Sequence, residues 1–256
     1  NVVIEVDGDP HQFIEELRRA LPPLARIERI EYSQGLSDAN LKEMGFRILK
    51  SEKGERGVAI PNDFAICGPC SQDMFDPQNR RYLYPFTNCT DCGARFTIID
   101  DLPYDREKTS MRSFPMCPEC RAEYEDPTCR RFHHQTISCP LCGPKYYALD
   151  KEGRRMRGDP VDLFSRGLQD GKVGVIKSWG GMHICCTLEN LSHLRRWYRR
   201  DQKPFAVMVR DMGSLYGYAR PTDKDVELIT SGHRPIVLVE KVPTDITEMI
   251  SPGLGN

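Results

Sequence analysis

The sequence predicts an α+β protein of several domains: a small α/β sandwich, a duplicated four-cysteine zinc-finger module and a further α/β domain. Two observations lead to this prediction. Eight of the 11 cysteines form four C-x-x-C pairs, which recur in two copies. The segments on either side instead alternate β-branched stretches with amphipathic ones. We place the domains at residues 1–52, 60–150 and 158–256.

The first domain is predicted from three strands and one helix. Residues 2–6 are mostly β-branched, as in a strand, and Pro10 stands where a helix over 11–21 would begin. Apolar residues alternate over 25–33, and a further strand is expected at 45–50. This order suits one edge of a small sandwich. The charged, glycine-containing stretch SEKGERGV then reads as a linker.

The middle domain is an internal repeat, seen when CGPCSQDMFDPQNRRYLYPFTNCTDCG is laid over CPECRAEYEDPTCRRFHHQTISCPLCG. Each copy has the form C-x-x-C, 18 residues, C-x-x-C, and the copies are 50 residues apart. Asp-Pro and Arg-Arg pairs also coincide. Paired knuckles of this kind are typical of structural zinc sites. The predicted ligands are Cys67, Cys70, Cys89 and Cys92 in the first copy, and Cys117, Cys120, Cys139 and Cys142 in the second.

Two structural zinc ions are therefore expected, each with four thiolates and no open coordination position. Iron–sulfur clusters use other spacings, and a redox role for a single C-x-x-C does not account for a duplicated frame. We expect each copy to close its own site, although an exchange of knuckles between the copies fits the spacing too. Zinc binding would supply roughly 10–16 kcal/mol toward folding, so its removal should melt residues 67–142.

The other candidate ligands are expected to have different roles. Cys129 aligns with Asn79 of the first copy, and Cys185 and Cys186 lie in apolar sequence, where they read as small buried hydrophobic residues. His133 and His134 are expected at the surface or in hydrogen bonds, because four cysteines already complete each site.

The last domain is predicted from helices at 162–171 and 191–200, and strands at 172–178, 205–210 and 235–240. The whole chain of 256 residues has a net charge of −1, so no general attraction to nucleic acid or to anionic membranes is implied. It contains neither a long apolar run nor a secretory leader, and a cytoplasmic protein is expected. Both ends look cut, which suggests a fragment of a longer protein.

A family resemblance rests on RRYLYPFTNCTDCGARFTIID, PYDREKTSM and EYEDPTCRRFHHQTISCPLCGP. These segments resemble the zinc-finger region of the HypF-type hydrogenase maturation carbamoyltransferases. Residues 1–50, especially PPLARIERIE, resemble the second half of that family's acylphosphatase-like domain, and residues 160–256 resemble the beginning of its YrdC-like domain. The resemblance thus implies two partial domains around a complete finger module.

The resemblance also implies an activity. Carbamoyl phosphate would be cleaved, and ATP with magnesium would activate the carbamate as a carbamoyl adenylate. The carbamoyl group would pass to the C-terminal cysteine of a partner protein and become a cyanide ligand of [NiFe]-hydrogenase. The family's acylphosphatase arginine and asparagine and its transfer domain have no counterpart in this chain. We therefore assign no catalytic residue, and the chain alone should not complete the reaction.

A basic cluster in the last domain is the candidate nucleotide site. Arginines at i,i+4 spacing repel one another unless an anion lies among them, but a solvated basic face would give the same pattern. The resemblance favours nucleotide binding, although Tyr198 replaces an expected lysine and Thr187 an expected aspartate. The residues predicted to contact the nucleotide in one pocket are Lys177, His183, Arg200 and Lys203.

The alternative function is a zinc-ribbon module that binds nucleic acid or protein without catalysis. Cations interleaved with aromatic side chains are typical of single-strand binders. The chain is not basic, however, and ion pairs that brace each finger explain the arginines more simply. The residues concerned are Arg80, Arg81, Tyr82, Tyr84, Arg130, Arg131 and Phe132.

Overall fold

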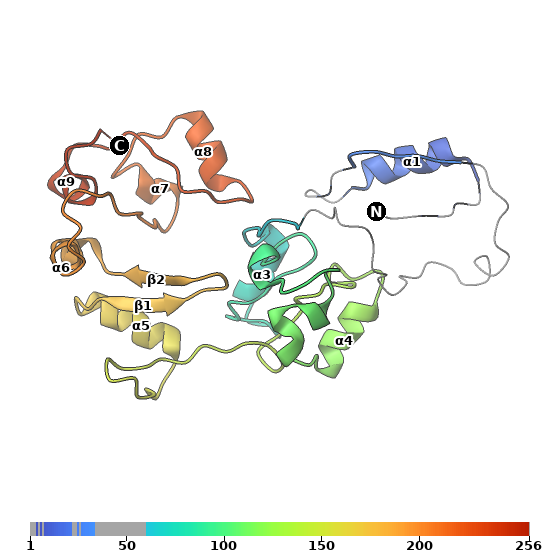
Figure 1. Ribbon diagram of the computed structural model, residues 1–256, viewed down its shortest axis with the longest axis horizontal. Helices are drawn as coiled ribbons and strands as arrows, with labels where there is room; N and C mark the ends of the chain where they lie inside the picture. Colours follow the sequence, from blue (N-terminus) through green and yellow to red (C-terminus); the bar gives the residue numbers. More distant parts are fainter. Residues whose placement is uncertain are drawn as a thin grey trace.

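The structure, a computed structural model, describes residues 4, 6, 8–21, 25, 27–33 and 60–255. The described part mixes helices with one short strand pair (Figure 1). The finger module, with helices α3 (Gly68–Phe75) and α4 (Pro118–Glu125), lies between helix α1 (Pro10–Arg19) and the last part of the chain.

The predicted first helix is confirmed as α1. Asp9 caps it by accepting a hydrogen bond of 2.9 Å from the His11 amide, and Pro10 occupies its first turn. The predicted strand over 25–33 is wrong for the described residues 27–33, which have no strand structure. An alternating pattern forms a strand only beside a partner strand, and none is described here. Ile4 and Val6 are likewise outside any strand, and 45–50 lies outside the described residues.

Each first C-x-x-C pair opens a helix. Cys67 and Cys117 occupy the N-cap positions of α3 and α4, with a proline in the first turn of each helix. Each second pair is a tight turn, in which the Cys92 amide donates to the Cys89 carbonyl at 3.2 Å. Gly93 follows with φ +90°, a conformation that only glycine adopts without strain.

Three short 3-10 helices join the two finger copies: η1 (Phe96–Ile98), η2 (Arg106–Lys108) and η3 (Ser110–Ser113). Arg106 ties this connection to the second copy. Its guanidinium donates to the carbonyls of Gln135 at 2.7 Å and Ile137 at 2.9 Å. The connection is therefore held against the fingers by hydrogen bonds rather than left as a free loop.

The last part begins with helix α5 (Pro160–Gln169) and the antiparallel strands β1 (Gly174–Lys177) and β2 (Met182–Cys185). The predicted helix and its terminal glycine are confirmed, since Gly171 has φ +75° just after α5. Gly174 lets α5 approach the strand closely, because a Cβ there would lie 2.5 Å from the Phe164 ring. The hairpin extends toward the fingers (Figure 1).

Short helices follow: η4 (Leu188–Asn190), α6 (Leu191–Trp197), α7 (Met212–Leu215), α8 (Asp223–Thr230) and α9 (Asp245–Ile250). Helix α6 is shorter than predicted, because Tyr198 caps it and Arg199 has φ +49°. The buried residues Leu191 and Leu194 lie on α6, which contacts α9.

The predicted strands at 205–210 and 235–240 are wrong: neither segment forms a strand. Several of their apolar side chains are exposed, with Met208 97% and Ile236 82% accessible, and no described strand pairs with either segment. Apolar alternation cannot make a ladder without a partner. None of the described helices is both long and apolar enough to cross a membrane.

Candidate metal centres

The eight cysteines of the four C-x-x-C pairs form two separate clusters. In each, four sulfur atoms lie within 4.8 Å of one another, and all four come from the same copy of the repeat. The expectation that each copy closes its own site is therefore met, and exchange of knuckles between copies is not seen. Cys67, Cys70, Cys89 and Cys92 form the first cluster, and Cys117, Cys120, Cys139 and Cys142 the second.

The sulfur spacing fits a tetrahedral zinc ion. Zinc–sulfur bonds of about 2.3 Å imply sulfur–sulfur edges of about 3.8 Å. The edge between Cys67 and Cys89 is 3.7 Å and that between Cys89 and Cys92 is 3.9 Å. In the second cluster the edges are 3.7 Å, 3.8 Å and 3.6 Å. All 11 cysteines are free thiols, and four sulfurs fill the coordination shell of each site.

The local backbone favours negatively charged sulfur. Cys67 and Cys70 lie at the N-terminus of α3, and Cys117 and Cys120 at that of α4, where the helix dipole stabilises thiolate. The Asp91 amide also donates to Cys89 Sγ at 3.4 Å. Both sites thus combine a soft donor set with a backbone that favours the thiolate form.

Arginines of the first copy reach the second metal site. Arg80 donates to Cys120 Sγ at 3.3 Å and pairs with Glu123 at 2.8 Å. Arg81 is 2% exposed and binds both Glu123 carboxylate oxygens, at 3.0 and 2.5 Å. Burial raises the pKa of Glu123, but its hydrogen bonds and charge contacts with Arg81 and Arg80 outweigh this effect and lower that pKa to about 2.

Arginines of the second copy reach the first site in the same way. Arg130 donates to Cys70 Sγ at 2.9 Å and pairs with Asp73. Arg131, 5% exposed, lies 2.5 Å from the same carboxylate and 3.8 Å from Cys70 Sγ. The predicted intramolecular ion pairs that brace the fingers are therefore confirmed, and each pair joins one finger to the other. Arginines engaged in this way are poorly placed for nucleic acid.

The two histidines lie outside both sulfur clusters. His134 is 3% exposed, and its Nε2 atom lies 2.7 Å from Asn88 Oδ1 and 2.8 Å from Thr136 Oγ1. Burial, and then the positive charge of Arg95, hold the pKa of His134 well below its usual range. His133 stacks on Tyr124, with ring centroids 4.7 Å apart. The expected hydrogen-bonding role is confirmed for His134.

The remaining cysteines are also outside the clusters. Cys129 belongs to neither cluster, as expected, and it is partly buried. Cys185 and Cys186 are only partly buried, so the expectation of fully buried small hydrophobic residues is not met. They lie at and just after the end of β2, the second strand of a two-stranded sheet that buries little.

The predicted nucleotide residues lie in two places. The β1–β2 register pairs Lys177 with Met182 and Ile176 with His183, so Lys177 and His183 project from opposite faces of the hairpin. Lys177 Nζ donates to the carbonyls of Ser178 and Trp179 at 2.9 and 3.3 Å. Their predicted contact with nucleotide remains a prediction.

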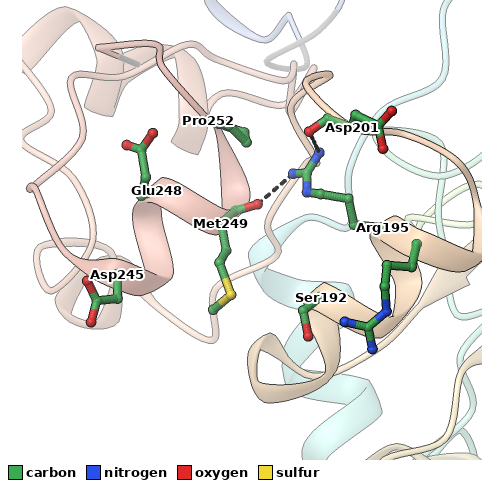
Figure 2. A pocket seen from close by; sticks show the side chains of 8 residues that line it. Ser192, Arg195, Asp201, Asp245, Glu248, Met249 and Pro252 are labelled. Atoms are coloured by element: carbon green, nitrogen blue, oxygen red, sulfur yellow. Dashed lines mark hydrogen bonds between the residues drawn. The ribbon is translucent and has the colours of Figure 1, made fainter.

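The other two residues follow α6. Arg200 donates to the Pro204 carbonyl at 2.9 Å, and its guanidinium lies over the Phe205 ring, 5.1 Å from the centroid. Lys203 is exposed. Arg195 belongs to the basic cluster seen in the sequence, but its guanidinium binds carbonyls from two segments, as Figure 2 shows for Asp201 and Met249. It lies beside a cavity of about 440 Å³.

The fold and the two sulfur sites define a class of protein: tandem four-cysteine fingers followed by an α/β domain. A family model described as "HypF finger" matches residues 66–99 and 116–149. A second, described as "Telomere recombination" and covering the Sua5, YciO and YrdC proteins, matches residues 166–256.

Known proteins are similar in sequence to nearly the whole chain. Carbamoyltransferase HypF of Rhizobium leguminosarum bv. viciae is 46% identical over 99% of this chain and 32% of its own length. Probable carbamoyltransferase HypF of Methanocaldococcus jannaschii is 44% identical over 94% of this chain and 32% of its own. The crystal structure of T. kodakarensis HypF superimposes with a TM-score of 0.80 and 41% identity, over 98% of this chain and 32% of that one.

A crystal structure of full-length HypF in the phosphate- and nucleotide-bound form gives a TM-score of 0.82 at 36% identity, over 96% of this chain and 32% of that one. The chain is thus similar to HypF proteins along nearly its whole length. It spans about a third of the length of the curated relatives it matches.

Proposed function

We propose that this chain forms part of a carbamoyltransferase that uses carbamoyl phosphate and ATP with magnesium to make a carbamoyl adenylate. The carbamoyl group then passes to the C-terminal cysteine of a maturation partner and supplies the cyanide ligands of [NiFe]-hydrogenase. What carries the proposal is the 43–46% identity to HypF carbamoyltransferases along 94–99% of the chain, across all of its parts. The free thiols suit a reducing compartment such as the cytoplasm.

Within that reaction the finger module is proposed to be architectural. Both metal sites are complete with four sulfurs, so a bound ion would have no open position for substrate. The first finger instead contacts the last part of the chain: Phe86 packs edge-on against Trp179 at 5.0 Å, and the Ala65 amide donates to the Gly232 carbonyl at 2.7 Å. The module would thereby hold the hairpin of the proposed nucleotide domain in place.

For nucleotide contact we propose the four predicted residues Lys177, His183, Arg200 and Lys203. Support comes from the match of residues 166–256 to a Sua5, YciO and YrdC family model. The exposed Lys177 ends β1 beside a glycine-containing turn, where a phosphate could approach the backbone closely. Because the hairpin register places His183 on the face opposite Lys177, His183 would contact the nucleotide from that opposite face or through another part of the protein.

The test uses a protein that carries this chain together with sequence matching the rest of the relatives. Carbamoyl-phosphate-dependent exchange between pyrophosphate and ATP is expected. It should fall in Lys177→Ala and Arg200→Ala, with Lys172→Ala, an exposed residue near α5, as the control. No exchange in the intact protein would remove the assignment.

The nucleic-acid alternative makes a different prediction. A binder would take up labelled single-stranded nucleic acid tightly and lose affinity steeply between 50 and 200 mM salt. With Arg81 and Arg131 buried in ion pairs, no such binding is expected. Tight, salt-dependent binding would favour the alternative.

A further inference from the structure

The two fingers are linked by a reciprocal set of contacts. Arg80 and Arg81 pair with Glu123, and Arg130 and Arg131 pair with Asp73, so each partner lies at the equivalent position of the other copy. The backbone repeats the pattern. Arg81 Nε donates to the Ser138 carbonyl at 2.9 Å, and Arg131 Nε to that of Asn88 at 3.0 Å. The contacts between the two copies therefore resemble those of a two-fold symmetric dimer interface, although both copies belong to one chain.

The reciprocal contacts also include hydrogen bonds from the arginines to cysteine sulfur atoms of the metal sites. Each arginine pair reaches one sulfur atom of the opposite site. That sulfur belongs to Cys120 for the pair in the first finger and to Cys70 for the pair in the second, and both cysteines are 0% exposed. Four thiolates around a divalent ion leave excess negative charge in a buried place. Guanidinium groups that donate to thiolate disperse that charge and fix the direction of the sulfur, as outer-shell partners of metal ligands do.

We propose that Arg80, Arg81, Arg130 and Arg131 are positioning residues for the metal site of the opposite finger, and that the two ions consequently bind as a cooperative pair. An ordered finger presents its arginines to its neighbour. A finger that has lost its ion releases them, and the neighbour loses the groups that neutralise its sulfur. Neither site therefore keeps its full affinity when the other is empty.

The first experiment measures metal release and thiol reactivity in the whole chain. Arg130→Gln with Arg131→Gln is expected to speed alkylation of Cys67 and Cys70 in the first finger, read peptide by peptide in a mass spectrometer. Zinc affinity of that site should fall about 10- to 100-fold in a competition with a chromogenic chelator. The control is Arg121→Gln, an exposed arginine of α4 whose ion pair stays within the second finger.

The finger in which labelling becomes faster shows whether the arginines act on the opposite metal site. Faster labelling confined to the second finger, which carries the substitutions, would overturn the proposal, as would no change in either finger. Since the double variant removes buried charge, Arg131→Lys is a second test. It keeps the charge but loses the forked geometry, and a partial effect on the first finger is expected.

The second experiment tests cooperativity directly. Cys67→Ser with Cys70→Ser removes the first site, and the second site should then give up its zinc at a chelator concentration about 10- to 100-fold lower. Cys185→Ser with Cys186→Ser is the matched control outside both clusters. A second site that keeps its original affinity and labelling rate would contradict cooperative binding.

Discussion

Trp179 stands edge-on against Phe86, with ring centroids 5.0 Å apart and ring planes at 86°. Phe86 in turn contacts Tyr146 of the second finger copy. The tip of the β1–β2 hairpin therefore packs against aromatic side chains from both copies. Beside it, a Cβ at Gly180 would lie only 2.6 Å from Thr97 Cγ2. The finger module and the proposed nucleotide domain therefore meet at a close-packed contact next to Lys177.

The close approach at Gly180 leads to a first prediction. Gly180→Ala should push the hairpin from the first finger and cost about 1–3 kcal/mol, because Thr97 can turn away only by giving up its hydrogen bond to Asp63. In a Trp197→Phe background, Trp179 fluorescence should shift to longer wavelength. Gly181→Ala, where a Cβ meets nothing within 4 Å, is the control. Adding Thr97→Ser should restore the contact, and failure to do so would refute this account.

Metal removal is the second test. Chelation should melt residues 67–142, since the sites supply roughly 10–16 kcal/mol that small, polar fingers cannot replace. Hydrogen exchange would show loss of protection in α3 and α4, and added zinc should restore it. Protection that persists after elemental analysis finds no bound metal would contradict the prediction.

Arg195 provides the third prediction. Its guanidinium joins α9 to the turn after α6, and Arg195→Ala would remove the donor to partly buried carbonyls of both segments, at a cost of about 1–3 kcal/mol. Arg196→Ala is the matched control, because Arg196 is exposed on the same helix and lines the same cavity. Urea unfolding of the two variants measures the difference, and equal midpoints would argue against this role. The carbonyls belong to Arg200, Asp201, Lys203, Met249 and Ile250.

His134 gives the finger module a pH dependence. Because its folded pKa is lowered, the unfolded chain binds the proton more readily, and stability falls as pH drops below about 6.5. His134→Gln should flatten this dependence between pH 8 and 5.5, although Gln is expected to lower stability at the upper end. Thermal unfolding of the zinc-loaded protein across that range measures it. The exposed His193 supplies the control, His193→Gln, which should leave the slope unchanged.

Structural features could be predicted from the sequence where the residues that determine them are close together in the chain. The knuckle spacing identified both sulfur clusters, and Pro10 and Gly171 marked the ends of α1 and α5 correctly. The strand at 205–210 failed, because a ladder depends on a partner that no local pattern reveals.

The ion pairs of the arginines were predicted, but their crossing between the copies was not, for a related reason. The repeat shows that Asp73 and Glu123 occupy equivalent positions, as do Arg81 and Arg131, but this equivalence fits pairing within a copy as well as between copies. Only the three-dimensional arrangement distinguishes the two. The equivalent acidic positions were the available signal.

Phe86 illustrates what duplication inside one polypeptide permits. Its counterpart in the second copy is Thr136, which is fully buried and hydrogen-bonds to His134. Identical subunits of a symmetric dimer must change together, but tandem copies diverge independently. At this position the first copy presents an aromatic side chain to the neighbouring domain, whereas the second copy has a buried polar side chain. The two copies therefore share one fold but present different surfaces to the rest of the molecule.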